Sequence, residues 1–109
     1  MFEKVHLKLM EKKYGVNTKN CTEVIYLRSI IRKMIGELST DITDFNNEVT
    51  VLTNKINYYS STGKGTQLAY LDEKLVNHKK SVKSLVKERK RRNKDLAVLN
   101  YQMGKFEGK

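Results

Sequence analysis

Two long heptad runs on either side of a glycine-containing turn constrain the fold of this chain more than any other feature. In each run, residues of one helix face recur at alternating steps of four and three, and the chain contains no proline. This spacing draws a narrow apolar seam along an α-helix, and a second helix must cover such a seam. The upstream seam comprises Val24, Arg28, Ile31, Ile35, Leu38, Ile42, Phe45, Val49, Leu52, Ile56 and Tyr59. The downstream seam comprises Leu68, Leu71, Leu75, His78, Val82, Leu85, Arg89, Arg92, Leu96, Leu99, Met103 and Phe106.

The pattern predicts one all-α domain over residues 1–109, an antiparallel helical hairpin or coiled coil of two long helices with a short N-terminal helix packed on it. We expect a second subunit as a further way to cover its apolar stripe. The predicted segments are a helix over 2–14, a helix over 20–59, a turn over 60–66, a basic helix over 67–103 and a frayed tail over 104–109.

The ends of these helices carry recognisable signals. Gly15 suits the left-handed residue that follows a helix. Asn20 is expected to cap the next helix, with Glu23 reaching back to the N–H of Asn20, and Thr66 is expected to cap the last one. The first helix is predicted to bury a stripe of Phe2, Val5, Leu9 and Met10. A strand that alternates Val5, Leu7 and Leu9 is the alternative, but it has no partner strand in the sequence.

The middle of the first long helix is its weakest part. Gly36 and the Ser, Thr and Asp residues from Ser39 to Asp44 prefer caps to helix interiors. A break near Ser39 is therefore the alternative to a continuous helix. The heptad passes through this zone without changing phase, which favours continuity.

Antiparallel pairing places His78 opposite Val49, and Arg89 and Arg92 opposite Leu38 and Ile35. We expect nearby acids of the partner helix to receive the two guanidinium groups: Glu37, Asp41 and Asp44. Flanking positions that would face each other across the hairpin are all acidic, which favours a third helix or another subunit on that edge: Asp41, Glu48, Glu88 and Asp95.

Charge is distributed unevenly along the chain. The net charge is +10, and residues 60–109 hold +8 of it. Such asymmetry is typical of proteins with an acidic partner. Cys21 is the only cysteine, no apolar signal core follows the N-terminus, and no apolar run approaches the length of a membrane span. We therefore expect a cytoplasmic protein in a reducing compartment, with no membrane association.

Residue chemistry indicates no enzyme, metal or cofactor. The stretch from Thr62 to Gln67 resembles the end of a phosphate-binding loop. The motif, however, needs an earlier glycine and an incoming strand, whereas a helix leads in here, so the glycines are interpreted as a turn. His6, His78 and Cys21 lack metal-ligand spacing. Neither a paired carboxylate in a predictable cleft nor a nucleophile near a histidine is present.

The strongest functional signal is basic. Between Lys79 and Lys94 stand nine Lys or Arg residues against one acid. The solvent-facing members form a cationic stripe of Lys79, Lys80, Lys83, Lys87, Lys90, Arg91 and Lys94. It predicts electrostatic, sequence-tolerant binding of DNA or RNA, or of an acidic protein surface. A solvent-exposed face without a ligand is the third possibility.

The alternative function is a protein–protein module, such as an adaptor, assembly factor or inhibitor, in a homo-oligomer or hetero-complex. Its predicted interaction edge is Leu27, Met34 and Val86, beside the seam. Basic coiled-coil hairpins of this size recur among phage, plasmid and chromatin-associated proteins, which is an analogy of shape only.

Overall fold

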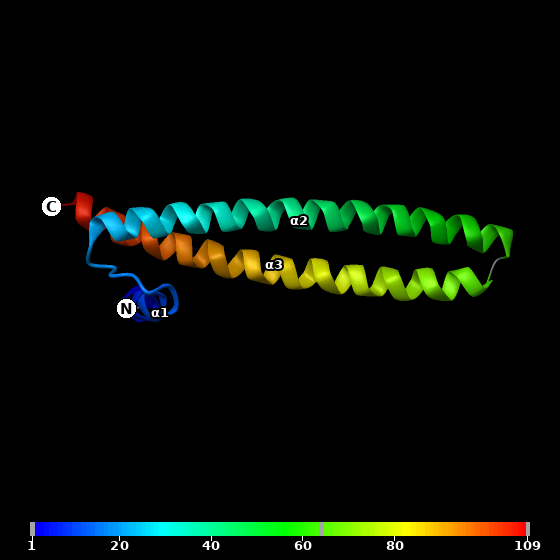
Figure 1. Ribbon diagram of the computed structural model, residues 1–109, viewed down its shortest axis with the longest axis horizontal. Coiled ribbons are helices and arrows are strands. Elements are labelled where there is room, and N and C mark those ends of the chain that lie inside the picture. Colours follow the sequence, from blue (N-terminus) through cyan, green and yellow to red (C-terminus); the bar gives the residue numbers. More distant parts are fainter. Residues whose placement is uncertain (1, 64, 109) are drawn as a thin grey trace. The chain divides into compact units, whose positions relative to one another are not determined.

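The computed structural model describes residues 2–63 and 65–108, and within these ranges it contains three α-helices and no strand. Helix α1 spans Phe2–Tyr14, α2 spans Cys21–Thr62 and α3 spans Gly65–Glu107. α2 and α3 pack against each other as an antiparallel hairpin, and α1 packs on α3 (Figure 1). The predicted all-α hairpin with a short N-terminal helix is confirmed. Parts of the predicted turn and tail, Lys64 and Lys109, lie outside the described residues.

The turn between α2 and α3 is shorter than the seven residues expected. Ser61 and Thr62 are still helical, and their hydroxyls donate to the carbonyl oxygens of Tyr58 and Tyr59 at 2.7 and 3.2 Å. Gly63 then takes a φ of 75°, the left-handed conformation that ends the helix. α3 begins at Gly65, so Thr66 lies inside its first turn and is not the predicted cap.

The connection from α1 to α2 follows the predicted signals with one difference. Gly15 has a φ of 66°, and its N–H donates to the Glu11 carbonyl at 2.9 Å. The Asn20 side chain caps α2 by accepting from the Glu23 N–H at 3.1 Å. The Glu23 carboxylate, however, accepts from the N–H of Asn17 and not from that of Asn20. The Asn20 N–H is already engaged, because it donates to the Asn17 carbonyl at 3.1 Å.

α2 is continuous through Ser39, as the unbroken heptad phase indicated. The chain nevertheless forms two compact units: a three-helix unit of residues 1–37 and 89–109, and a two-helix unit of residues 38–88. Each unit contains part of α2 and part of α3.

The three-helix unit contains the main hydrophobic core. α1 contributes two side chains, Leu7 and Met10, which are 6 and 2% exposed. The long helices contribute the others: Val24, Leu27, Ile31, Leu99 and Met103. Phe106 packs against this cluster, and α3 accordingly continues to Glu107, past the predicted end at Met103.

The predicted buried stripe of α1 is wrong at two of its positions. Val5 is 63% exposed and Leu9 is 62% exposed, whereas Leu7 and Met10 are buried. The side chain of Phe2 lies outside the described residues. Helix formation was predicted correctly, but the helix is rotated so that Leu7, Met10 and Tyr14 face the core.

The two-helix unit is held by the predicted seam. Ile42, Leu52 and Leu71 are its buried members. The Phe45 and His78 rings meet edge to face with centroids 5.5 Å apart. His78 also contacts Glu48, which adjoins its predicted partner Val49, so the predicted register holds in this unit. None of the helices, over the residues described, is both long and apolar enough to cross a membrane.

Candidate functional site

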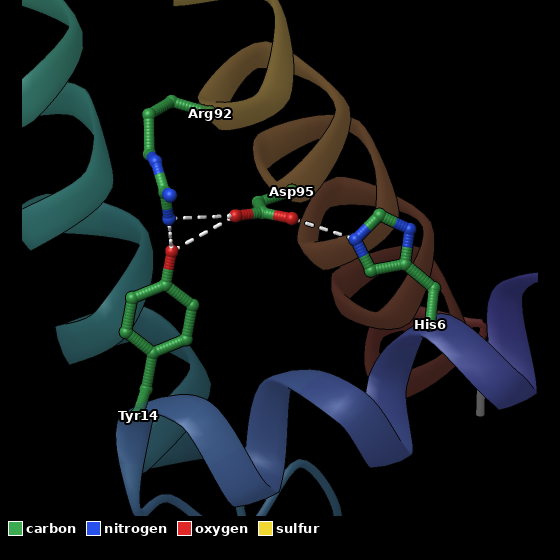
Figure 2. A network of polar contacts seen from close by, with 4 residues as sticks. All are labelled: His6, Tyr14, Arg92 and Asp95. Atoms are coloured by element: carbon green, nitrogen blue, oxygen red, sulfur yellow. Dashed lines mark hydrogen bonds and ion pairs between the residues drawn. The ribbon is translucent and has the colours of Figure 1, made fainter. Parts of the chain in front are cut away.

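A buried polar cluster joins α1 to α3 in the three-helix unit. Asp95 is its centre: one carboxylate oxygen accepts from His6 Nε2 at 2.6 Å, and the other accepts from the Tyr14 hydroxyl at 2.8 Å and from Arg92 Nη1 at 3.1 Å. Arg92 Nη1 also donates to the Tyr14 hydroxyl oxygen. Figure 2 shows His6 and Tyr14 extending from α1 on either side of Asp95. Arg92 and Asp95 are 4 and 8% exposed, so the ion pair at the centre of this network is shielded from water.

Electrostatics keeps the Tyr14 phenol in its protonated form. Burial comes first and the neighbouring Asp95 carboxylate second, and together they raise the pKa of Tyr14 to about 12. A protonated phenol can donate to Asp95 while its oxygen accepts from Arg92. The Tyr14 hydroxyl therefore bonds to both members of the Arg92–Asp95 ion pair.

The polar groups of the cluster satisfy one another. Among the described residues, no buried side-chain nitrogen or oxygen lacks a hydrogen-bond partner. The Arg92–Asp95 pair is an i, i+3 pair on α3, and its charges are compensated where they lie. We interpret the cluster as the polar anchor of α1.

This anchor adds to one expectation and fulfils another. Acids of α2 were expected to receive the Arg92 guanidinium, and Arg92 also donates to Tyr14 of α1 and Asp95 of α3. The acidic edge was also expected to be covered by a third helix or a subunit. At Asp95 the covering element is α1. The sequence did not reveal this cluster because it depends on contacts between residues 89 and 81 positions apart.

A second polar contact lies in the two-helix unit. His78 Nδ1 faces the Lys74 carbonyl oxygen at 2.9 Å, and Nε2 faces a Glu48 carboxylate oxygen at 2.5 Å. The side chain of His78 is 15% exposed and that of Glu48 is 60% exposed, so the acid of this pair faces water. Over residues 2–63 and 65–108, no group of three or more His, Cys, Asp or Glu side chains could hold a metal ion.

The cationic stripe is at the surface. All seven of its members are exposed on α3. The two-helix unit carries Lys79, Lys80, Lys83 and Lys87, and the three-helix unit carries Lys90, Arg91 and Lys94. In the three-helix unit, Lys13 of α1 lines the same groove as Arg91 and Lys94.

The predicted interaction edge is less accessible than the stripe. Leu27 is 2% exposed and belongs to the core, while Met34 and Val86 are half-buried. Leu27 therefore does not form part of an exposed edge. Large apolar side chains are exposed elsewhere, and the most exposed aliphatic ones are Val5 and Leu9 of α1.

Val5 and Leu9 line an open groove of about 380 Å³ between α1 and α3. Its walls also include Met10 and three cationic residues, Lys13, Arg91 and Lys94. His6 and Asp95 complete the lining, and they are bonded to each other as described above. The groove thus combines an apolar surface with a cationic rim. The sequence signal that could have revealed it is the four-residue spacing of Val5, Leu9 and Lys13, once Leu7 and Met10 are assigned to the core.

Comparison with known proteins adds no functional information: no family model matches the chain, and no curated protein or solved structure is significantly similar to it.

Proposed function

We propose that this protein is a non-enzymatic nucleic-acid-binding protein that contacts the phosphate backbone through its cationic stripe. The observation that carries the proposal is the exposure of all seven stripe cations on α3, Lys79, Lys80, Lys83, Lys87, Lys90, Arg91 and Lys94. Lysine and arginine side chains that neutralise phosphates release condensed counterions, and this release drives sequence-tolerant binding. Such binding needs dense, accessible positive charge and no base-reading pocket.

The test is titration of fluorescein-labelled duplex DNA and single-stranded RNA with the full chain over a range of salt concentrations. We expect the logarithm of the binding constant to fall linearly with the logarithm of salt concentration. A combined charge reversal should then flatten this slope, by about 0.9 for each duplex phosphate that the protein no longer neutralises. The reversed residues are Lys83→Glu, Lys87→Glu, Lys90→Glu and Arg91→Glu.

A matched control carries four equal charge reversals on exposed lysines of α1 and α2: Lys8→Glu, Lys12→Glu, Lys33→Glu and Lys55→Glu. Both variants lower the net charge equally, so only the location of the change differs. No binding at low salt would contradict the proposal. So would an equal loss of affinity in the two variants, because general attraction to a basic protein would then explain the data.

The second candidate is a protein–protein module with an acidic partner. The exposed Val5 and Leu9 favour it, because phosphate binding gives aliphatic side chains no role.

A further inference from the structure

The groove between α1 and α3 has features that nucleic-acid binding does not account for. Val5 and Leu9 are exposed by 63 and 62%, although Leu7 and Met10 on the same helix are buried. Two large aliphatic side chains four residues apart form a contiguous apolar ridge on one helix face. A ridge beside an open groove is typical of surfaces that receive another protein segment.

The charges around the groove define what can enter it. Lys13 comes from α1, and Arg91 and Lys94 come from α3, so cations stand on both walls. Of the residues described as lining the groove, only Asp95 is acidic, and its carboxylate is taken up by His6, Tyr14 and Arg92. The accessible charge is therefore positive. It complements an acidic occupant and disfavours a second copy of this chain, which has a net charge of +10.

We propose that this groove docks an acidic amphipathic helix of a partner protein. Leucine-like side chains of that helix, spaced at i and i+4, pack against Val5 and Leu9. Its carboxylates lie on both flanks, where Lys13, Arg91 and Lys94 bind them. Burial of the ridge supplies the affinity, and the cations select the partner and orient it. This inference goes beyond the proposed function and shares only Arg91 and Lys94 with it.

The experiment is selection of helical peptides of about 16 residues, roughly four turns, from a displayed random library against the full chain. Binders are counter-selected on the Val5→Ser/Leu9→Ser double variant. Enriched peptides should converge on acidic residues around an i, i+4 apolar pair. Their affinity should fall by at least about tenfold on the double variant, because the ridge then has less aliphatic area to remove from water on binding.

A matched control removes comparable aliphatic area from the two-helix unit. Val51 and Val76 are 52 and 50% exposed, so Val51→Ser/Val76→Ser should leave peptide affinity unchanged. Circular dichroism of both double variants checks that they are folded. The selection overturns the proposal if it enriches no peptide that depends on Val5 and Leu9, or if the dependent peptides are basic or uncharged.

Two further ligands separate this proposal from its competitors. The wild type and the Val5→Ser/Leu9→Ser variant are titrated with phosphatidylserine–phosphatidylcholine vesicles and with the duplex DNA described above. Vesicle binding that depends on Val5 and Leu9 would assign the ridge to a lipid surface and refute peptide docking. DNA affinity should be equal in the two proteins, and an equal loss for DNA and peptide would refute a separate groove. If the stripe proposal fails instead, the wild type does not bind DNA.

Discussion

Removal of the Asp95 carboxylate should be the most damaging single polar change in the three-helix unit. Asp95→Ala takes an acceptor from His6, from Tyr14 and from Arg92 at once. The guanidinium of Arg92 belongs to a residue that is 4% exposed, so its charge would lose a close counter-charge in a place that water hardly reaches. Breaking a buried ion pair by removing one partner costs about 3–5 kcal/mol. A loss of this size should lower the midpoint of thermal unfolding by more than about 10 °C.

The assay is urea and thermal unfolding followed by circular dichroism, together with hydrogen exchange of the α1 amides. Exchange should rise in α1, because the carboxylate anchors that helix on α3. Glu48→Ala is the matched control, since it also removes a histidine-bonded acid, but one whose side chain is 60% exposed. Exposed ion pairs contribute about 0–1 kcal/mol. If Asp95→Ala costs no more than Glu48→Ala, the interpretation of Asp95 as a buried anchor is wrong.

Three further outcomes follow from the geometry. The pKa of Tyr14 is raised from 10.0 to about 12, so the stabilisation that its protonated hydroxyl provides is complete below pH 10 and is lost as the pH rises toward 12. Denaturant unfolding between pH 10 and 12 should therefore show a smaller loss of stability for Tyr14→Phe than for the wild type. Gly36→Ala should stabilise the protein by about 1 kcal/mol in urea unfolding, because Gly36 lies inside α2 and an added Cβ meets nothing within 4 Å. Gly63→Ala should instead destabilise it by about 1–2 kcal/mol in the same assay, because the φ of Gly63 is 75°, and destabilisation of both variants would contradict this pair of expectations.

Much of the fold was predictable because the heptad is a repeated, local signal. Every seam residue named from the sequence is buried or half-buried in the structure. The continuity of α2 followed from the same phase, which outweighed the poor helix propensity of Ser39 and its neighbours. The turn was predicted too long because Ser61 and Thr62 are helical, with their hydroxyls bonded to preceding carbonyls. Side-chain bonding of this kind depends on rotamers that a residue pattern does not specify.

The rotation of α1 was not predictable from its own apolar residues. The residues that offer two competing apolar stripes are Val5, Leu7, Leu9 and Met10. In the observed orientation the Leu7 face turns inward and Asp95, far away in the sequence, bonds to His6 and Tyr14. This long-range polar contact accompanies the burial of the Leu7 face, and the periodicity of a single sequence carries no information about it.

The groove between α1 and α3 and the polar residues that interrupt the seam have one structural origin. Arg92 occupies a seam position where an aliphatic residue would continue the zipper between α2 and α3, and Asp95 stands one turn further along α3. Such a pair weakens a two-stranded coil unless something compensates its charges. α1 supplies Tyr14 and His6 for that purpose, and the rotation that delivers them turns Val5 and Leu9 outward beside Arg91 and Lys94. The exposed ridge is therefore a consequence of how α1 is anchored. Asp95→Ala should therefore weaken peptide docking in the groove, because it releases the anchor of α1, while DNA binding through the stripe lysines of the two-helix unit should persist.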